Sequence, residues 1–402
     1  MSKNTVIYLD NNATTPVALP VLEAMTACAR CQHANPASYH RLGQRARQVV
    51  ERSRESLLVA LGGNLTGHPP DQFISTSGAT EANNWVLRRL CGKGPIVCSA
   101  IEHPSVSRMG QLLQREGVDV CWLNVDHNGL VCLEQLELFL RRGPKLVSII
   151  WANHETGVIQ PMIEIDRLCS HYGVPLHTDA TQIFAKQKID FRQFDISAIT
   201  VSAHKFHGPV GIGGVLIRSG VSLSPFLQGG FQQGGLRPGT ESPVLAEGLK
   251  TAWEWSLRQI ELDECFLITM RDRLEERIRE AFPEVVIHGD AVKRAPQTTC
   301  FSLPEIDRQA LLMALDQAGV ACSTGAACES GAQKRSPTLE AMGCKPHQVE
   351  TAIRLSVGRL NTPEEVEEAA DRILLSVRNL QRPSSRGSGG IPARRQTPKM
   401  VD

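Results

Sequence analysis

The sequence lacks a large excess of charge of either sign: 43 lysines and arginines face 42 aspartates and glutamates, for a formal net charge of +1. Binding to nucleic acid usually requires a basic surface, so the composition gives no basis for a nucleic-acid partner. The sequence also lacks a run of about 18 apolar residues, which argues against a transmembrane helix. The first ten residues lack the apolar core of a secretory signal peptide. We therefore expect a cytoplasmic protein without a membrane partner.

The sequence holds twelve cysteines, but their spacing shows no paired pattern. In a reducing compartment such cysteines stay free thiols and behave mostly as small buried hydrophobic residues. Four of them fall inside apolar segments and fit this description: Cys98, Cys121, Cys132 and Cys169. Cys28 and Cys31 form a single CxxC pair, which without a second pair is weak evidence for a zinc or redox site. We predict no metal site.

Short apolar segments alternate with helical patterns through the first two thirds of the chain. This alternation predicts an α/β fold with a large, mostly parallel, seven-stranded sheet covered by helices on both faces. An earlier helical pattern over 40–61 ends at two glycines, and helices are also expected over 104–116, 133–141 and 163–172. The expected strands are Gln72–Thr76, Ile96–Ala100, Val118–Val125, Leu146–Ala152, Pro175–Asp179, Ile196–Val201 and Gly213–Ile217.

A second, smaller domain is expected after the sheet. A long helical pattern from Pro243 to about Phe282 links the two, and a mixture of short strands and helices follows, so the smaller domain is α+β. At 402 residues the chain is long enough for two domains. The tail is rich in Ser, Gly, Pro and Arg and cannot form a core, so we expect it to be disordered. The predicted parts are an N-terminal segment (1–20), a large domain (21–255), a small domain joined by the N-terminal segment (256–381), and the tail (382–402).

A lysine stands out at the end of one expected strand, in Ser202-Ala-His-Lys205-Phe-His-Gly-Pro209. Burying an ammonium group is costly, so lysines usually reach the solvent. A desolvated amine beside hydroxyl and imidazole groups is instead suited to condense with an aldehyde and form a Schiff base. On these eight residues alone, a strand-end lysine that extends to water is an equally good interpretation.

Two further segments suit a phosphorylated cofactor. Asp179 ends an expected buried strand, and a carboxylate at the carboxyl edge of a parallel sheet can pair with a protonated pyridine nitrogen. Taken alone, Asp179 could equally cap a helix. The segment Thr76-Ser-Gly-Ala-Thr-Glu-Ala82 follows a strand and opens a helix, which makes an anion site of a kind that suits phosphate. Many helices begin in this way without binding an anion.

Two residues in the last quarter of the chain, Cys328 and Arg354, are candidates for contact with a substrate. Cys328 lies in a run of Gly, Ser and Ala, where a thiolate could reach a substrate as a nucleophile. Cys322 follows Val320-Ala321 and fits a core position at a strand end. Arg354 lies in an alternating strand pattern and could clamp a substrate carboxylate, or form an ordinary ion pair between domains.

With these segments in view, the sequence from about Val6 to Leu380 resembles the class V branch of fold-type I enzymes that use pyridoxal 5′-phosphate (PLP). Within that branch it is most similar to cysteine desulfurases with a long cysteine loop. Each motif is weak alone, but together they are specific. They are Tyr8-Leu-Asp-Asn-Asn-Ala-Thr-Thr-Pro16, Asn35-Pro-Ala-Ser38, Ser77-Gly-Ala-Thr-Glu81, Glu102-His103, Asp179 with Gln182, Ser202-Ala-His-Lys205, Arg237-Pro-Gly-Thr240, Cys328 and Arg354.

The resemblance implies a role for each matching position. Lys205 would hold PLP and move the Cα proton, His103 would stack on the ring and assist, and Cys328 would take the substrate sulfur as a persulfide, releasing L-alanine from L-cysteine. Asp179 would pair with the pyridinium nitrogen, and Gln182 would contact the phenolic oxygen. The implied phosphate ligands are Thr80, Ser202 and His204, with Thr240 from the second subunit of a homodimer; Ala79 and His154 are further cofactor contacts, and Asn12, Asn153 and Arg354 are substrate contacts.

The sequence departs from the family pattern at two places. His154 stands where a second asparagine is usual, and an imidazole is larger and ordinarily titrates near neutral pH. The segment Phe231-Gln-Gln-Gly-Gly235 stands where Gln-Glu-Arg is usual, in a loop near the dimer interface of relatives.

The implied activity is cysteine desulfurization for iron–sulfur cluster or thio-cofactor assembly, with a sulfur-acceptor or scaffold protein as partner. Two alternatives remain open on the sequence. A selenocysteine lyase shares the fold and most of the motifs. A PLP-fold protein with weakened catalysis that binds a sulfur carrier would explain the two departures, although Lys205, Asp179, His103, Cys328 and Arg354 are all retained.

Overall fold

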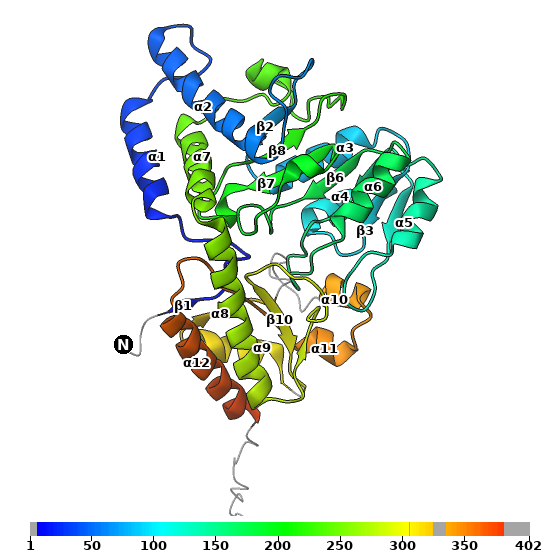
Figure 1. The fold of residues 1–402 in the computed structure, drawn as a ribbon, viewed down its shortest axis with the longest axis vertical. Helices are drawn as coiled ribbons and strands as arrows, with labels where there is room; N and C mark the ends of the chain where they lie inside the picture. The colour runs from blue at the N-terminus through cyan, green and yellow to red at the C-terminus, as the bar shows by residue number, and fades with distance from the viewer. Residues whose placement is uncertain (1–5, 305, 325–334, 382–402) are drawn as a thin grey trace, which may run out of the picture.

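The computed structural model describes residues 6–304, 306–324 and 335–381. Cys328 and the tail 382–402 lie outside these ranges, so the predictions for them are not addressed by the fold. The described chain forms a large α/β part, which lies above a smaller α+β part in Figure 1, and the helix α8 (Ile260–Ala281) runs down through the smaller part.

The large part is built on one seven-stranded sheet with the strand order β2-β8-β7-β6-β5-β3-β4. β8 runs antiparallel to both of its neighbours, whereas the other adjacent pairs are parallel. The predicted mostly parallel sheet is thereby confirmed. The strands are β2 (Gln72–Thr76), β3 (Ile96–Ser99), β4 (Val120–Leu123), β5 (Leu146–Ser148), β6 (Leu176–Asp179), β7 (Ala198–Ser202) and β8 (Gly213–Ile217).

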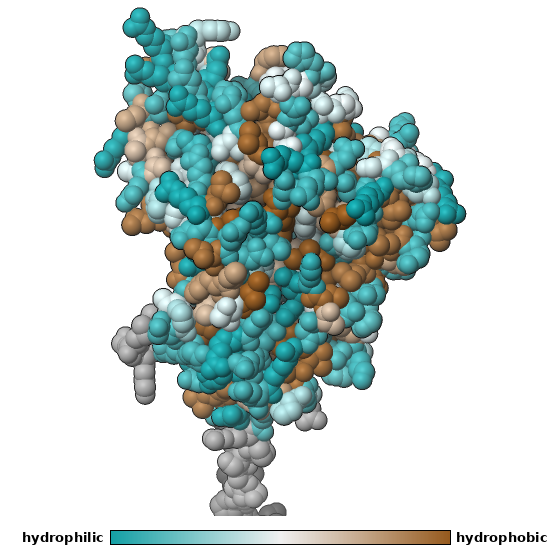
Figure 2. All heavy atoms as spheres, in the orientation of Figure 1, coloured by the Kyte–Doolittle hydropathy of each residue, from teal (hydrophilic) through white to brown (hydrophobic). Residues whose placement is uncertain are grey.

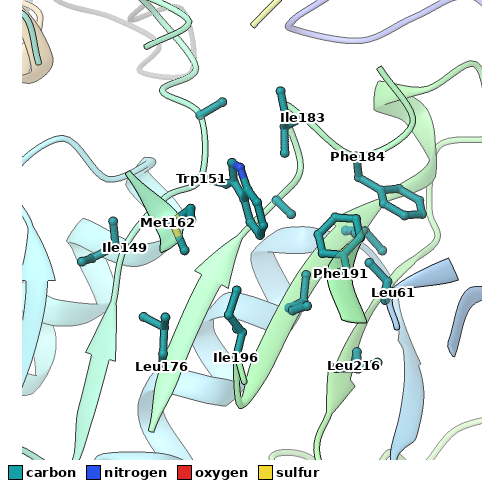
Figure 3. Packing of buried hydrophobic residues seen from close by; sticks show 14 of the residues in the cluster. Leu61, Ile149, Trp151, Met162, Leu176, Ile183, Phe184, Phe191, Ile196 and Leu216 are labelled. Atoms are coloured by element: carbon teal, nitrogen blue, oxygen red, sulfur yellow. The ribbon is translucent and has the colours of Figure 1, made fainter. Parts of the chain in front are cut away.

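Helices cover both faces of this sheet. One face packs against α3 (Ala79–Leu90) and α4 (Pro104–Arg115). The other face carries a larger apolar cluster, in which Phe184 stacks on Trp253 at 4.8 Å between ring centroids and Trp151 lies edge-on to Phe191 (Figure 3). The helices on this second face are α1 (Leu19–Cys31), α2 (Arg41–Ala60), α5 (Leu133–Leu140), α6 (Met162–His171) and α7 (Pro243–Leu257).

The small part has its own apolar cluster beneath α8, α9 (Arg308–Gln317) and α12 (Pro363–Gln381). Its antiparallel sheet has the order β12-β10-β9, and a separate parallel pair joins β1 to β11. The exposed side of α8 is hydrophilic in Figure 2. The strands are β1 (Ile7–Tyr8), β9 (Val286–Ile287), β10 (Thr298–Ser302), β11 (Val320–Ala321) and β12 (Ala352–Ser356). Because β1 pairs with β11, the N-terminal segment packs with the small part; the domain boundaries at residues 20, 255 and 381 stay predictions.

The sequence patterns were wrong or incomplete at the helices. The expected continuous helix over 243–282 is two helices, because Gln259 has φ −146° and ψ 33°, which ends α7 and begins α8. The helix α1 was missed, since its N-cap is Ala18, which offers no side-chain cap. The short helices α10 (Pro337–Ala341) and α11 (Pro346–Thr351) were missed as well. Cys28 and Cys31 lie at the end of α1 as free thiols, one buried and one exposed. Within the described residues, no helix is long and apolar enough to cross a membrane.

Candidate active site at the carboxyl edge of the sheet

Lys205 is held at the carboxyl end of β7 by packing on one side and hydrogen bonds on the other. A single 3-10 turn (Ala203–Lys205) follows the fully buried strand, and the next residue, Phe206, packs edge-on to Phe184 at 5.3 Å between ring centroids. Lys205 Nζ donates hydrogen bonds to the backbone oxygens of Asn12 (2.5 Å) and Ala13 (2.8 Å). The amine is thus bound by the N-terminal segment, so it does not simply extend to water.

Asp179 ends β6, the strand beside β7, and the residue is 4% exposed. Its Oδ2 accepts a hydrogen bond from Asn83 Nδ2 at 2.7 Å, and its Oδ1 accepts one from the backbone N–H of Thr181 at 2.9 Å. A turn follows Asp179, not a helix, so it is not a helix cap. Asn83, on α3, carried no sequence signal, because its role depends on a contact between distant segments.

Gln182 is connected to Lys205 through a shared acceptor. Its Nε2 donates to the backbone oxygen of Asn12 at 3.0 Å, the same oxygen that accepts from Lys205. Its Oε1 accepts from Lys186 Nζ at 3.1 Å. Both lysines therefore contact one short chain of hydrogen bonds, and Lys186 is a second site residue that the sequence did not reveal.

His103 and His154 lie edge-on, with ring centroids 5.1 Å apart. His103 caps α4: its Nδ1 accepts from the backbone N–H of Ser105 at 3.1 Å, so the proton of the neutral ring is on Nε2. Burial lowers the pKa of His103, and the positive charge of Lys205 lowers it further.

Burial also lowers the pKa of His154 well below its ordinary value, and nearby His103 and Arg354 act in the same direction. His154 thus departs from the ordinary titration of an imidazole, because burial disfavours the charged form of the ring. His154 Nδ1 is buried and has no hydrogen-bond partner among the described residues. It is thus a polar atom that a ligand can satisfy.

Arg354 lies on β12 and is 3% exposed. One terminal nitrogen donates to the backbone oxygen of His154 at 3.0 Å, and the other pairs with Asp10 Oδ1 at 2.7 Å. Its Nε is buried without a partner among the described residues. Arg354 thus forms an ion pair with the N-terminal segment and retains one unsatisfied donor, and its assignment to a substrate carboxylate stays a prediction.

The two asparagines assigned to the substrate are already engaged by protein groups. Asn12 Nδ2 donates to Thr298 Oγ1 at 2.8 Å, and Asn12 Oδ1 accepts from Gln297 at 3.0 Å. Asn153 Nδ2 donates to the backbone oxygen of Ile101 at 3.0 Å, and its Oδ1 accepts from backbone N–H groups of the following turn. Both side chains hold the backbone around the site, and their contact with substrate stays a prediction.

The segment expected to bind phosphate begins α3 directly after β2. Its N-cap is Gly78, so no side chain caps the first turn that holds Ala79 and Thr80. A Cβ on Gly213 of β8 would lie 3.0 Å from the Cα of Gly78, and a Cβ on Gly78 would lie 3.7 Å from Ser202 Oγ. The glycines therefore permit a close approach of α3 to the end of β7, which leaves backbone donors and a hydroxyl group side by side.

His204 and Thr240, the two other residues assigned to the phosphate, have different surroundings in the chain. His204 Nδ1 is 3.2 Å from Thr14 Oγ1, and burial together with Lys205 lowers the His204 pKa to about 4, so this ring is neutral at neutral pH. Thr240 lies on an exposed loop of its own chain. That loop is tied to α3, because Arg237 pairs with Glu81 through Nε at 2.8 Å.

Gln232 and Gln233, where the sequence departs from the family pattern, both form hydrogen bonds through their side-chain amides. The Gln233 carboxamide accepts from Ser75 N–H at 2.8 Å and donates to Ser75 oxygen at 2.9 Å, which caps the open edge of β2. Gln232 Oε1 accepts from Gly239 N–H at 3.1 Å. The two amides therefore hold this loop together with the ion pair of Arg237 and Glu81. Cys322 is partly buried against the small apolar cluster, and burial raises its thiol pKa to about 12, as expected for a core residue.

The sheet, the lysine at its carboxyl edge and the neighbouring aspartate define an enzyme of the fold-type I architecture. A family model described as "Aminotransferase class-V" matches residues 7–368. The chain therefore belongs to the class V aminotransferase family, whose members are PLP enzymes.

Curated and solved relatives agree with this assignment. A "Cysteine desulfurase" of Sinorhizobium fredii is 35% identical over 380 residues, covering 93% of this chain and 97% of the relative. A solved NifS-like protein from Rickettsia africae aligns with a TM-score of 0.85 at 29% identity, covering 93% of this chain and 99% of that one. A structure titled "SspA in complex with cysteine" aligns with a TM-score of 0.74 at 29% identity, covering 87% and 98%.

Proposed function

We propose that this protein is a PLP-dependent cysteine desulfurase that converts L-cysteine to L-alanine and leaves a persulfide on Cys328, for iron–sulfur cluster or thio-cofactor assembly. The relatives carry that activity in their names, and one solved neighbour is titled as a complex with cysteine. The observation that carries the proposal is Lys205, whose amine is bound at the carboxyl edge of the sheet, with Asp179 on the adjacent strand.

The donors and acceptors of the site fit PLP. Asp179 offers a carboxylate, held by Asn83, for a pyridinium nitrogen, and Gln182 offers an amide for the phenolic oxygen. His154 contributes a buried imidazole nitrogen that lacks a partner among the described residues. For the phosphate we propose the first turn of α3, Ala79 and Thr80, with Ser202, His204 and the partner subunit's Thr240. Bound PLP supplies an electron sink that acidifies the Cα–H of an amino acid.

Different side chains of the protein have separate roles toward the substrate. Lys205 supplies the amine that binds the cofactor and moves the Cα proton. His103 carries its proton on Nε2 because Ser105 occupies Nδ1, so the neutral ring offers an N–H that can donate a hydrogen bond at the reacting centre and assist the proton transfer by Lys205. Arg354 offers its Nε to the substrate carboxylate, and Asn12 and Asn153 hold the surrounding backbone and line the substrate side.

One residue of the chain, Cys328, accepts the sulfur of the substrate. The Cys328 thiolate attacks the sulfur of L-cysteine, the carbon–sulfur bond breaks, a sulfur–sulfur bond forms, and the released carbon takes a proton to become the methyl group of alanine. The persulfide then passes to a sulfur-acceptor or scaffold protein. Cys322 does not suit this task, since burial raises the pKa of its thiol to about 12.

A homodimer and a cytoplasmic location complete the proposal. A groove of about 880 Å³ runs between the loop around Ala37 and the loop around Gln232, and two aromatic rings stand exposed on it, Tyr39 (90% exposed) and Phe231 (84%). A second copy of the chain would cover these rings and bring its Thr240 to the site.

Mass spectrometry after treatment with L-cysteine tests the proposal. We expect an added mass of about 32 Da, one sulfur atom, on Cys328. Cys322→Ser should keep the adduct and Cys328→Ser should lose it. An adduct spread over other cysteines, or bound PLP with no alanine released, would contradict the proposal. A Cys328→Ser enzyme that releases alanine only from selenocysteine would favour a selenocysteine lyase.

A further inference from the structure

A second lysine is buried beside Lys205, at the end of the turn that follows Asp179. Lys186 is only 7% exposed, and no carboxylate of the described residues pairs with it. Burial, Lys205 and Arg354 together lower the pKa of its amine well below the ordinary value. Burying an amine without a counter-charge opposes folding, and such groups occur preferentially at functional sites.

The contact of Lys186 determines how Gln182 is turned. Gln182 Nε2 donates to the backbone oxygen of Asn12, and a backbone oxygen can only accept. The Gln182 NH2 group therefore faces Asn12, and its Oε1 faces Lys186 Nζ at 3.1 Å. Gln182 is 5% exposed. Without Lys186, its oxygen would be buried without this donor, which disfavours the observed orientation.

Among the residues that the structure describes, Lys186 has no hydrogen bond or ion pair other than the one to Gln182. It lines a small cavity of about 30 Å³ together with Lys205, Gln297 and the ion pair of Asp263 with Arg359. That volume holds one or two waters at most. The Asp263 carboxylate is engaged by Arg359 at 3.0 Å, and the other titratable groups near Lys186 are His204 and His207, whose pKa values it helps to lower.

We propose that Lys186 is a positioning residue of the Lys205 site: by donating to Gln182 Oε1, it keeps the Gln182 NH2 group turned toward Asn12 and Lys205. This inference rests on the proposed function, because Gln182 is the residue assigned to the phenolic oxygen of PLP. An NH2 group can donate to that oxygen, whereas a carboxamide oxygen would repel it. Lys186 acts only through Gln182 and does not itself touch the reacting atoms.

The proposal predicts a spectroscopic consequence. A donor on the phenolic oxygen stabilises its negative charge, which lowers the proton affinity of the neighbouring nitrogen that links Lys205 to PLP. With Gln182 free to turn, that nitrogen should hold its proton to higher pH. In Lys186→Met, we expect the pKa read by visible absorbance to rise by about one unit, and the Kd for PLP to rise about tenfold, the effect of losing one hydrogen bond.

Two matched variants separate positioning from structure. Lys186→Gln keeps a neutral N–H donor and should titrate close to the wild type. In a Gln182→Met background, Lys186→Met should cause no further shift, because the residue through which it acts is gone. The cofactor-free Lys186→Met protein should unfold close to the wild type, since the cost of leaving Gln182 Oε1 without its donor opposes the gain from removing a buried amine that no carboxylate neutralises.

The outcomes distinguish this inference from the proposed function. If the wild type binds PLP and releases alanine from cysteine, but Lys186→Met titrates and binds PLP like the wild type, only the role of Lys186 is refuted. An equal shift in Lys186→Met and Lys186→Gln would also refute it, because the charge and not the donor would then matter. If the wild type fails to bind PLP, the proposed function fails and this inference with it.

Discussion

Glu102 provides the sharpest test of the electrostatics around the site. It precedes His103, it is 6% exposed, and burial raises the pKa of its carboxyl to about 8. Its Oε1 accepts from Ser99 Oγ at 2.5 Å and from Ile150 N–H at 2.7 Å, while Oε2 is buried without a partner among the described residues. At neutral pH this carboxyl is therefore mostly protonated in the folded protein.

The raised pKa of Glu102 sets how strongly the free energy of unfolding depends on pH. The ordinary pKa is 4.5, so the folded protein keeps a proton that the unfolded chain loses as pH rises from about 4.5 to about 8. The contribution of this bound proton to the free energy of unfolding is complete below pH 4.5 and is lost as the pH rises toward 8. Over this window the free energy of unfolding falls by about 1.4 kcal/mol per pH unit, or about 5 kcal/mol at most in total.

Glu102→Gln removes the titration but keeps an oxygen for Ser99 and Ile150. We expect the variant to match the wild type within about 1 kcal/mol at pH 5 and to exceed its stability by several kcal/mol at pH 8.5. Urea unfolding of the cofactor-free proteins at both pH values measures this. Glu284→Gln, at an exposed position, is the control and should show no such dependence. A Glu102→Gln difference that stays constant with pH would refute the raised pKa.

Three further predictions follow from single contacts. His154→Asn should change the level of activity but not the shape of its pH profile between pH 6 and 8, because burial lowers the pKa of the ring well below its ordinary value; a lost inflection would contradict this. Gln233→Ala should cost about 1–2 kcal/mol in urea unfolding through two lost hydrogen bonds to Ser75, and Gln232→Ala, which loses one exposed bond, should cost less. Gly213→Ala should cost about 2 kcal/mol or more, because its Cβ would lie 2.6 Å from the Val201 oxygen; wild-type stability would refute the close packing of β8 on β7.

The sheet could be predicted from the sequence because each strand is a short apolar run between helical patterns, and all seven expected strands formed. The break between α7 and α8 could not, because Arg258 and Gln259, the residues between the two helices, are neither glycine nor proline and give no local signal of a helix end. Lys205 and Asp179 could be singled out in the sequence because each is a charged residue at or just after the end of a buried strand. Asn83 and Lys186 were missed because their roles exist only once distant segments, or a turn, bring their partners within reach. Lys186 did offer one signal, its position four residues after Gln182.

The N-terminal segment explains why the site depends on both parts of the molecule. The Asn12 backbone oxygen accepts from Lys205 and Gln182, which lie on the large sheet. The same segment pairs with the small part through β1 and β11 and through the ion pair of Asp10 with Arg354. The position of the Lys205 amine is thus set by the turn that follows β1, and Ile7 and Leu9 on either side of that strand's end belong to the small apolar cluster. Loosening that cluster should therefore weaken the site before it unfolds the sheet, since the hydrogen bonds to Lys205 depend on this docking and the strand pairing of β7 does not.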